Sequence, residues 1–151
     1  MGGVVRAEEM QQGHIDHALS ITMTVTLANY IACPATHTDG NSTNAYAIPE
    51  GGLIQLDPNF DVDHQPWPVY EKVIAKALQT YGAYVSDTGG TIALYGQNDM
   101  NAGNVSWSQV YLGAVPGTGF DISNLPWAVG SSTSGFSSSS SFRVLKITSC
   151  N

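Results

Sequence analysis

Apolar and polar residues alternate strictly along residues 15–27, which is the most regular pattern in the chain. An alternation of period two is typical of a β-strand with one buried face, whereas a helix would scatter these apolar side chains around its surface. The apolar positions are Ile15, Leu19, Ile21, Met23, Val25 and Leu27. The pattern therefore predicts a strand over 15–27, with a single histidine, His17, on its buried face.

Residues 68–81 carry the clearest helix pattern, because their apolar side chains recur every three or four positions. Pro68 suits the first turn of a helix, and Gly82 suits its end. Val69 belongs to the apolar stripe that this spacing forms, whereas Glu71 lies off it. The pattern predicts a helix over 68–81 that packs through this stripe.

The remaining patterns predict one short helix and four more strands. The helix covers 5–12, and the strands cover 53–56, 83–86, 91–95 and 142–148. An antiparallel sheet with two peripheral helices is the simplest assembly of these elements. Because the chain has 151 residues, we expect a single domain over 1–151. Five strands are few for a closed sandwich, so we expect part of the sheet to come from residues outside this chain.

The charge balance excludes two classes of partner. The formal net charge is −7, and the sequence has only five Lys and Arg residues. Nucleic acids and anionic membrane surfaces both require clustered basic side chains, so neither is expected to bind. No apolar run is long enough to span a bilayer. A polar surface of low charge is common on secreted proteins.

The chain has two cysteines and two N-glycosylation sequons, and each pair suggests a covalent modification. Cys33 follows the long predicted strand, and Cys150 follows the last one. A disulfide between them would close most of the chain, and such a loop is worth about 4–5 kcal/mol in the chain-entropy model; two free thiols are the alternative. Asn41 and Asn104 begin the sequons, in polar, loop-like sequence where glycosylation is possible.

Several short phrases of the sequence, taken in order, resemble a group of secreted and largely uncharacterised bacterial and fungal proteins. The phrases are GHIDHAL at 13–19, PATHTDG at 34–40, IPEG at 48–51 with LDP at 56–58, ALQTYGAYVSD at 77–87 and FRVLK at 142–146. The chain is similar to the C-terminal half of these proteins. The resemblance implies a jelly-roll-like β-sandwich, an extracellular location and an association with carbohydrate. It also implies that a secretion signal and further strands lie outside this sequence, or that another copy supplies the strands.

The histidines at 14 and 17 and the acidic loop at 57–63 are the two stretches that invite a metal interpretation. His14 and His17 point to opposite sides of a strand, so they do not converge on one ion. Residues 57–63 space oxygen ligands at alternate positions, but Val62 stands where a calcium loop needs glycine. A solvated acidic loop and an irregular calcium site are the two alternatives there. The sequence does not indicate a cofactor.

Four residues are candidates for catalysis. Asp39, Glu50 and Asp87 each lie in or beside a predicted turn. If these turns meet at one end of the sheet, they provide the paired carboxylates that glycoside hydrolysis needs; the alternative is that they bond to their own turn backbone. His17 is the fourth candidate, at a concave sheet face, or else a core histidine bonded to a neighbour.

Aromatic side chains provide candidate stacking surfaces for sugar rings, with anchoring of the core or loops as the alternative. They are Trp67, Trp107, Trp127, Tyr95 and Tyr111. A polysaccharide lyase would instead need a His or Tyr base beside a cation, for which His17, Tyr84 and Arg143 have the right chemistry. No phosphate loop and no nucleophile motif is present.

The leading hypothesis is a secreted β-sandwich module that handles polysaccharide, by binding or by cleavage. It rests on the predicted half-buried sheet, the low charge, the aromatic residues and the resemblance. The alternative is a structural subunit of a surface or filament, which associates with itself and is completed by a neighbouring chain. A hydrolase acting on another substrate is a third possibility, without a supporting motif. The sequence leaves open whether the protein is an enzyme.

Overall fold

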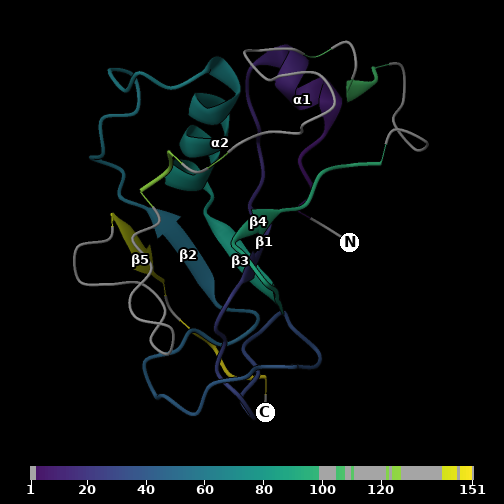
Figure 1. Ribbon diagram of the computed structural model, residues 1–151, viewed down its shortest axis with the longest axis vertical. Helices are drawn as coiled ribbons and strands as arrows, with labels where there is room; N and C mark the ends of the chain where they lie inside the picture. Colours follow the sequence, from purple (N-terminus) through teal and green to yellow (C-terminus); the bar gives the residue numbers. More distant parts are fainter. Residues whose placement is uncertain are drawn as a thin grey trace.

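The computed structural model describes residues 3–98, 105–107, 110, 122, 124–126, 141–145 and 147–150. These residues form one five-stranded sheet and two short helices (Figure 1). The helices are α1 (Ala7–Gln12) and α2 (Val69–Thr80), and the strands are β1 (Leu19–Met23), β2 (Leu53–Leu56), β3 (Ala83–Thr88), β4 (Ala93–Leu94) and β5 (Phe142–Val144). The prediction of a mainly β fold with two short helices is confirmed.

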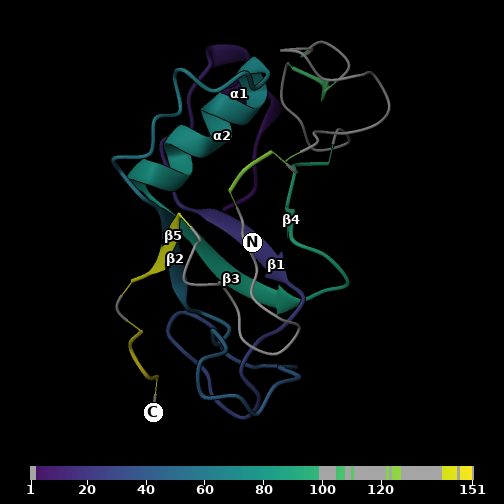
Figure 2. The ribbon, with the colours of Figure 1, turned by 60° about the vertical axis from the view of Figure 1, so that its left-hand side comes forward.

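The sheet is mixed, so the prediction of a purely antiparallel sheet is wrong. Its strand order is β4-β1-β3-β2-β5, and the central pair, β1 and β3, runs parallel (Figure 2). The other neighbouring pairs are antiparallel. Parallel neighbours need a long crossover connection, and here the chain between β1 and β3 passes through β2 and α2 before it returns.

The core lies where one face of the sheet meets the two helices. Ile21, Ile54 and Val85 come from three neighbouring strands and are fully buried, together with Leu78 of α2 and Met10 of α1. Side chains of alternate strand residues point to opposite faces, so the neighbours of these residues line the other face of the sheet. The sheet therefore has a helix-covered face and a second face on which a site can open.

Gly82 makes the change from α2 to β3 possible. Its φ is +74°, and a Cβ atom at this position would lie 2.3 Å from the carbonyl oxygen of Ile54. Only glycine combines this backbone conformation with such a close approach. The predicted end of the helix at Gly82 is thus confirmed, and the turn brings β3 directly alongside β2.

The strand predicted over 15–27 is shorter in the structure. Only residues 19–23 form β1, although Ile15 and Val25 are also buried as the alternation predicts. His17 is half-buried rather than buried, because it lies before the paired strand and its ring turns toward Glu9 of α1.

The predicted stripe of α2 is wrong at its first turn. Val69 is 55% exposed, whereas Glu71 is fully buried. A carboxyl oxygen of Glu71 accepts a 3.0 Å hydrogen bond from the side-chain amide of Asn124. A segment far along the sequence thus covers the helix where the pattern places solvent.

Cys33 and Cys150 form a disulfide, as predicted. The adjacent backbone is paired as well, because the N–H of Cys33 donates a 2.8 Å hydrogen bond to the carbonyl of Thr148. A disulfide that joins distant parts of a fold indicates a non-reducing setting. Among the helices that the structure describes, none has the length and apolar character needed to cross a membrane.

Candidate functional site

A groove of about 500 Å³ opens over β1 and β3, on the face of the sheet away from the helices. We call it the sheet groove. Tyr84 and Ser86 of β3 form its floor with Ser20, which is the register partner of Tyr84. One wall comes from residues 34–37, just after Cys33, and another from Gly51. The groove therefore combines an aromatic ring with hydroxyl groups.

The hydroxyl of Ser86 is fixed from below. The buried side chain of Ser20 donates a 2.8 Å hydrogen bond to the Oγ of Ser86, which itself donates to the carbonyl of Ile21. Ser86 remains exposed. Its oxygen is thus held in place and can accept a hydrogen bond from a ligand.

Glu50 lies beside the groove, buried at the end of β3. Its Oε1 atom accepts hydrogen bonds from the hydroxyl of Thr88 at 3.1 Å and from the hydroxyl of Thr26 at 3.4 Å. The backbone N–H of Asp39 donates to the same atom at 3.4 Å. Glu50 is only 2% exposed, so its carboxyl group depends on these protein partners.

The carboxyl groups of Asp39 and Glu50 lie close enough to shift each other's pKa in opposite directions. Burial, together with the neighbouring Asp39 carboxyl, raises the pKa of Glu50. Hydrogen bonds with Glu50 and Thr88 lower the pKa of the exposed Asp39. Of the two carboxyl groups, Glu50 therefore keeps its proton to the higher pH.

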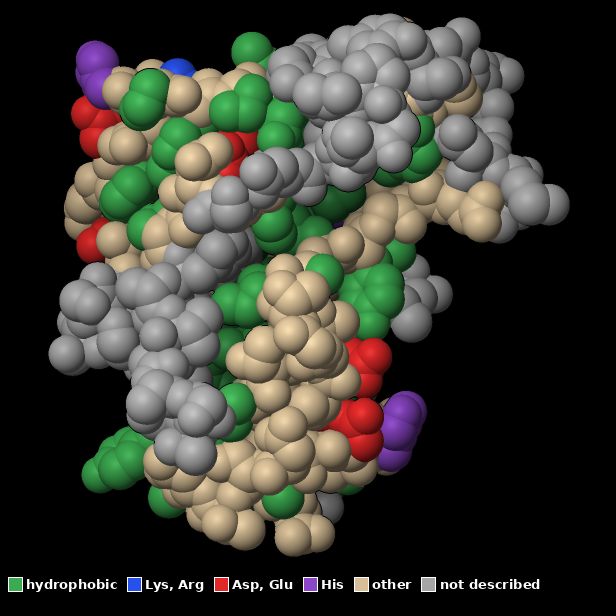
Figure 3. Space-filling model, in the orientation of Figure 1, with side chains coloured by type: hydrophobic (Ala, Val, Ile, Leu, Met, Phe, Trp, Pro, Cys, Tyr) green, Lys and Arg blue, Asp and Glu red, His purple; other side chains and the backbone are tan. Residues whose placement is uncertain are grey.

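Asp87 joins the same group through Tyr95. The Tyr95 hydroxyl donates a 3.1 Å hydrogen bond to Oδ2 of Asp87. Burial, followed by the hydrogen bond and charge of Asp87, raises the pKa of Tyr95, and the charge of Asp39 acts on it in the same direction. Figure 3 shows acidic side chains beside a histidine near the end of β3. The structure thus brings Asp39, Glu50 and Asp87 together, and we call them the carboxyl cluster.

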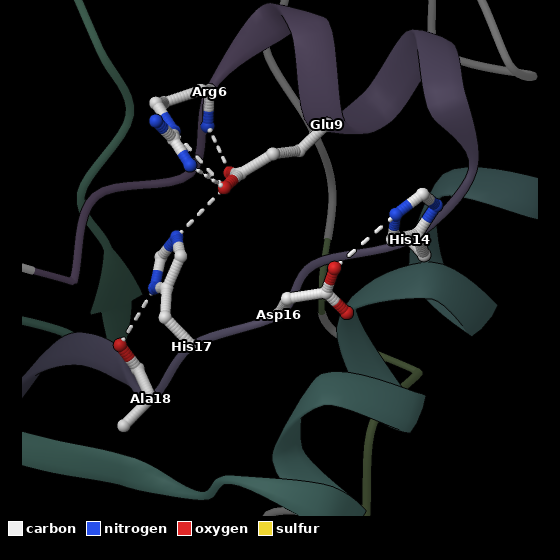
Figure 4. A network of polar contacts seen from close by, with 6 residues as sticks. All are labelled: Arg6, Glu9, His14, Asp16, His17 and Ala18. Carbon is white, nitrogen blue, oxygen red and sulfur yellow. Dashed lines mark hydrogen bonds and ion pairs between the residues drawn. The ribbon is translucent and has the colours of Figure 1, made fainter.

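His17 is held in a separate network, shown in Figure 4. Its Nδ1 lies 2.9 Å from the carbonyl oxygen of Ala18, and its Nε2 lies 2.8 Å from Oε1 of Glu9. Both partners are acceptors, so each contact requires a proton on the ring nitrogen that faces it. These contacts connect β1 to α1 and leave neither ring nitrogen directed at the carboxyl cluster.

Glu9 is the centre of that network. Its buried carboxylate accepts hydrogen bonds from the Nε and the backbone N–H of Arg6, both at 2.9 Å. Burial raises the pKa of Glu9, but the hydrogen bonds from Arg6 and the charge of His17 outweigh it, so this pKa lies below its usual range. The network is a partly buried cluster in which Glu9 pairs with both Arg6 and His17.

The aromatic candidates serve mainly as anchors where the structure describes them. Trp67 stacks on Phe60 with ring centroids 5.7 Å apart, and the indole N–H of Trp107 donates a 2.6 Å hydrogen bond to the carbonyl of Gln97. Two further candidates, Trp127 and Tyr111, lie outside the described residues. Tyr84, rather than a tryptophan, is the aromatic side chain that lines the groove.

Of the two sequons, the structure describes only the one that begins at Asn41. Asn104 lies outside the described residues. Asn41 is exposed, and its amide donates a 3.1 Å hydrogen bond to the carbonyl of Thr24 while its oxygen accepts from the N–H of Thr26. The Asn41 side chain therefore holds its loop against the chain that leaves β1.

The acidic loop and the histidines near α1 pair locally. Asp61 lies 2.8 Å from the ring of His64, Asp63 pairs with Lys76, and His14 lies 3.3 Å from Asp16. Among the described residues, no three His, Cys, Asp or Glu side chains are grouped as a metal site requires.

The chain matches no protein-family model, no curated protein and no solved structure. The group that it resembles therefore stays a prediction, and the argument for function rests on the geometry of the groove and the carboxyl cluster. Sequence reasoning missed Thr26, Thr88 and His37. Thr26 and Thr88 could not have been identified, because polar residues are common in strands. His37 could have been, because it stands two residues before the candidate acid Asp39.

Proposed function

We propose that this protein is a secreted module that binds polysaccharide in the sheet groove. The observation that carries the proposal is the composition of the groove: Tyr84 and the exposed hydroxyl of Ser86 line it, next to Asp39 and Asp87. A pyranose ring has an apolar face that suits an aromatic ring, and its hydroxyl groups donate to carboxylates and accept from side-chain hydroxyls. The groove offers each of these partners within one surface.

Binding is favoured over cleavage by the contact between Asp39 and Glu50. The two carboxyls of a glycosidase flank the scissile bond and stand about 5–9 Å apart, whereas Glu50 is only 2% exposed and accepts a 3.4 Å hydrogen bond from the backbone N–H of Asp39 itself. The Glu50 carboxyl is therefore enclosed by protein partners rather than open to a scissile bond. Cleavage would require Asp87 as the opposing carboxylate, so the test below also follows product formation.

The proposed setting is extracellular, which the disulfide supports. As the resemblance implies, we propose that the sheet belongs to a jelly-roll-like fold in which further strands extend it at its edges and leave the groove open. Strands β4 and β5 stand at the edges of the described sheet, where further strands can pair. Glycosylation of Asn41 and Asn104 belongs to the same proposal, and mass spectrometry of protein from a eukaryotic secretory host would test it.

The experiment is affinity electrophoresis through gels that contain plant, algal and microbial polysaccharides, with assays for new reducing ends and unsaturated products. We expect at least one polysaccharide to retard the wild-type protein. Tyr84→Ala should remove most of the retardation, whereas Tyr46→Ala, which changes an 84% exposed tyrosine outside the groove lining, should not. The proposal is contradicted if no polysaccharide retards the wild-type protein and none yields products when incubated with it.

A structural role is the second candidate, supported by one observation. Val144 on edge strand β5 and Ile147 just after it are 41% and 37% exposed. Apolar side chains along a sheet edge favour pairing with another chain. Sedimentation of the protein at micromolar concentration tests this role, and a strict monomer would argue against it.

A further inference from the structure

We infer that the sheet groove selects its glycan by charge, so that amino sugars bind more tightly than neutral sugars and uronates are rejected. This inference rests on the proposed glycan binding and names the substrate class of that same site. The inference concerns the sign of the charge at the groove. The ability of the groove to stack against a sugar ring and hydrogen-bond it is a separate matter that belongs to the proposed function.

The groove and the carboxyl cluster share three segments of the chain. His37, Gly51 and Ser86 line the groove, and the cluster residues Asp39, Glu50 and Asp87 stand one or two positions from them. The Asp87 side chain is also held in position, because the Tyr95 hydroxyl donates a 3.1 Å hydrogen bond to it. The three cluster residues do not line the groove themselves, but they stand beside its lining, so a glycan in the groove lies within range of their charge.

The negative charge at the groove has no basic partner among the described residues. Each Lys and Arg that the structure describes bonds elsewhere: Arg6 to Glu9, Lys72 and Lys76 to Asp63, and Arg143 to Gln55. Asp39 is exposed and Asp87 is half-buried, so their charges face the solvent and any ligand there. His37 is the one described titratable group of opposite sign in the groove lining.

A ligand charge near these carboxylates should change affinity in one direction. An ammonium group is attracted and a carboxylate is repelled, and at a partly exposed rim each step from amine to neutral to acid should cost about tenfold in affinity. This order opposes a polysaccharide lyase, because lyases act on uronates.

The test uses hexasaccharides of glucosamine, glucose and glucuronate, with the matching galacto series, in titration calorimetry at about pH 6, where sugar amines are largely protonated and uronates are ionised. Asp87→Asn removes one charge and keeps an acceptor for Tyr95. Asp16→Asn removes the same charge from an exposed position outside the groove and serves as the control.

We expect wild-type affinity to fall from amine to neutral to acid in whichever series binds. Asp87→Asn should reduce the ratio of amino-sugar affinity to uronate affinity about tenfold. Added salt should reduce this ratio as well, whereas Asp16→Asn should leave it unchanged. Glucuronate or galacturonate binding as tightly as the amine overturns the inference while glycan binding stands. No binding by any of these six probes also overturns it, and the polysaccharide panel then decides whether the proposed function survives.

Discussion

The hydroxyl of Thr88 donates a 3.1 Å hydrogen bond to Oε1 of Glu50, and this contact joins the end of β3 to the loop that carries Asp39. The backbone strengthens the junction, because the N–H of Gly51 donates to the carbonyl of Val85 at 2.7 Å. The wall of the groove and the carboxyl cluster are therefore one mechanical unit. A change at Glu50 is expected to affect both.

We expect Glu50→Gln to remove a pH dependence of stability. Burial and Asp39 raise the pKa of Glu50 in the folded protein, so the folded state keeps a proton that the unfolded chain has lost. This contribution is full below the ordinary glutamate pKa and is lost as the pH rises through the folded pKa. Thermal unfolding from about pH 4 to about pH 8 should show a smaller loss of Tm in Glu50→Gln than in the wild type.

The matched control for this experiment is Asp16→Asn, which removes an exposed carboxylate whose ion-pair partner among the described residues is His14. Its pH profile should run parallel to the wild-type profile. Equal slopes in the wild type and Glu50→Gln would show that Glu50 does not hold the proton.

Thr26→Val should destabilise the fold although it conserves shape. Thr26 is fully buried, and its hydroxyl bonds to Glu50 and Thr88. Removing it leaves a buried carboxyl group with one donor fewer, which costs about 1–3 kcal/mol. Urea unfolding measures the change, and Thr148→Val, at an exposed position, should stay within about 0.5 kcal/mol of the wild type.

Thr26 and Glu71 also show where sequence patterns stop being informative. The alternation over 15–27 correctly identifies Leu19 and Ile21 as core residues, but it places Thr26 on the polar side although that side is covered too. Periodicity likewise places Glu71 off the buried stripe, because it contains no information about Asn124, which covers the helix from a distant segment. Local spacing predicts which face of an element is apolar and not which other segment packs on it.

The sequence could predict the carboxyl cluster only on the condition that three turns meet at one end of the sheet. The turns that carry Asp39, Glu50 and Asp87 are visible as Gly-rich and Pro-rich stretches, and the hypothesis that they meet follows from residue type. Whether they meet depends on β3 lying parallel to β1, which is a non-local pairing that the strand patterns do not encode. The disulfide was simpler to predict, since the chain has only two cysteines.

We expect His17→Ala to lower stability without changing glycan binding. The substitution removes a donor from the buried carboxylate of Glu9 and the link from that carboxylate to the carbonyl of Ala18, at a cost of about 1–3 kcal/mol. Urea unfolding and affinity electrophoresis on the same samples separate the two effects. A His17→Ala variant that folds with wild-type stability but loses glycan binding or products would place His17 in the functional site after all.

The disulfide should be the largest single covalent contribution to stability. Cys33 and Cys150 are 117 residues apart, so the bond removes much of the conformational freedom of the unfolded chain. In the chain-entropy model this is worth about 4–5 kcal/mol, a large share of the stability of a domain of this size. Replacing both cysteines by serine should lower the midpoint of urea unfolding accordingly. A reducing agent should destabilise the wild type to the same extent and leave the stability of the double variant unchanged. If the double variant unfolds at the wild-type midpoint, the pairing of Thr148 with Cys33 is sufficient to hold the C-terminal segment, and the loop-closure argument is wrong for this protein.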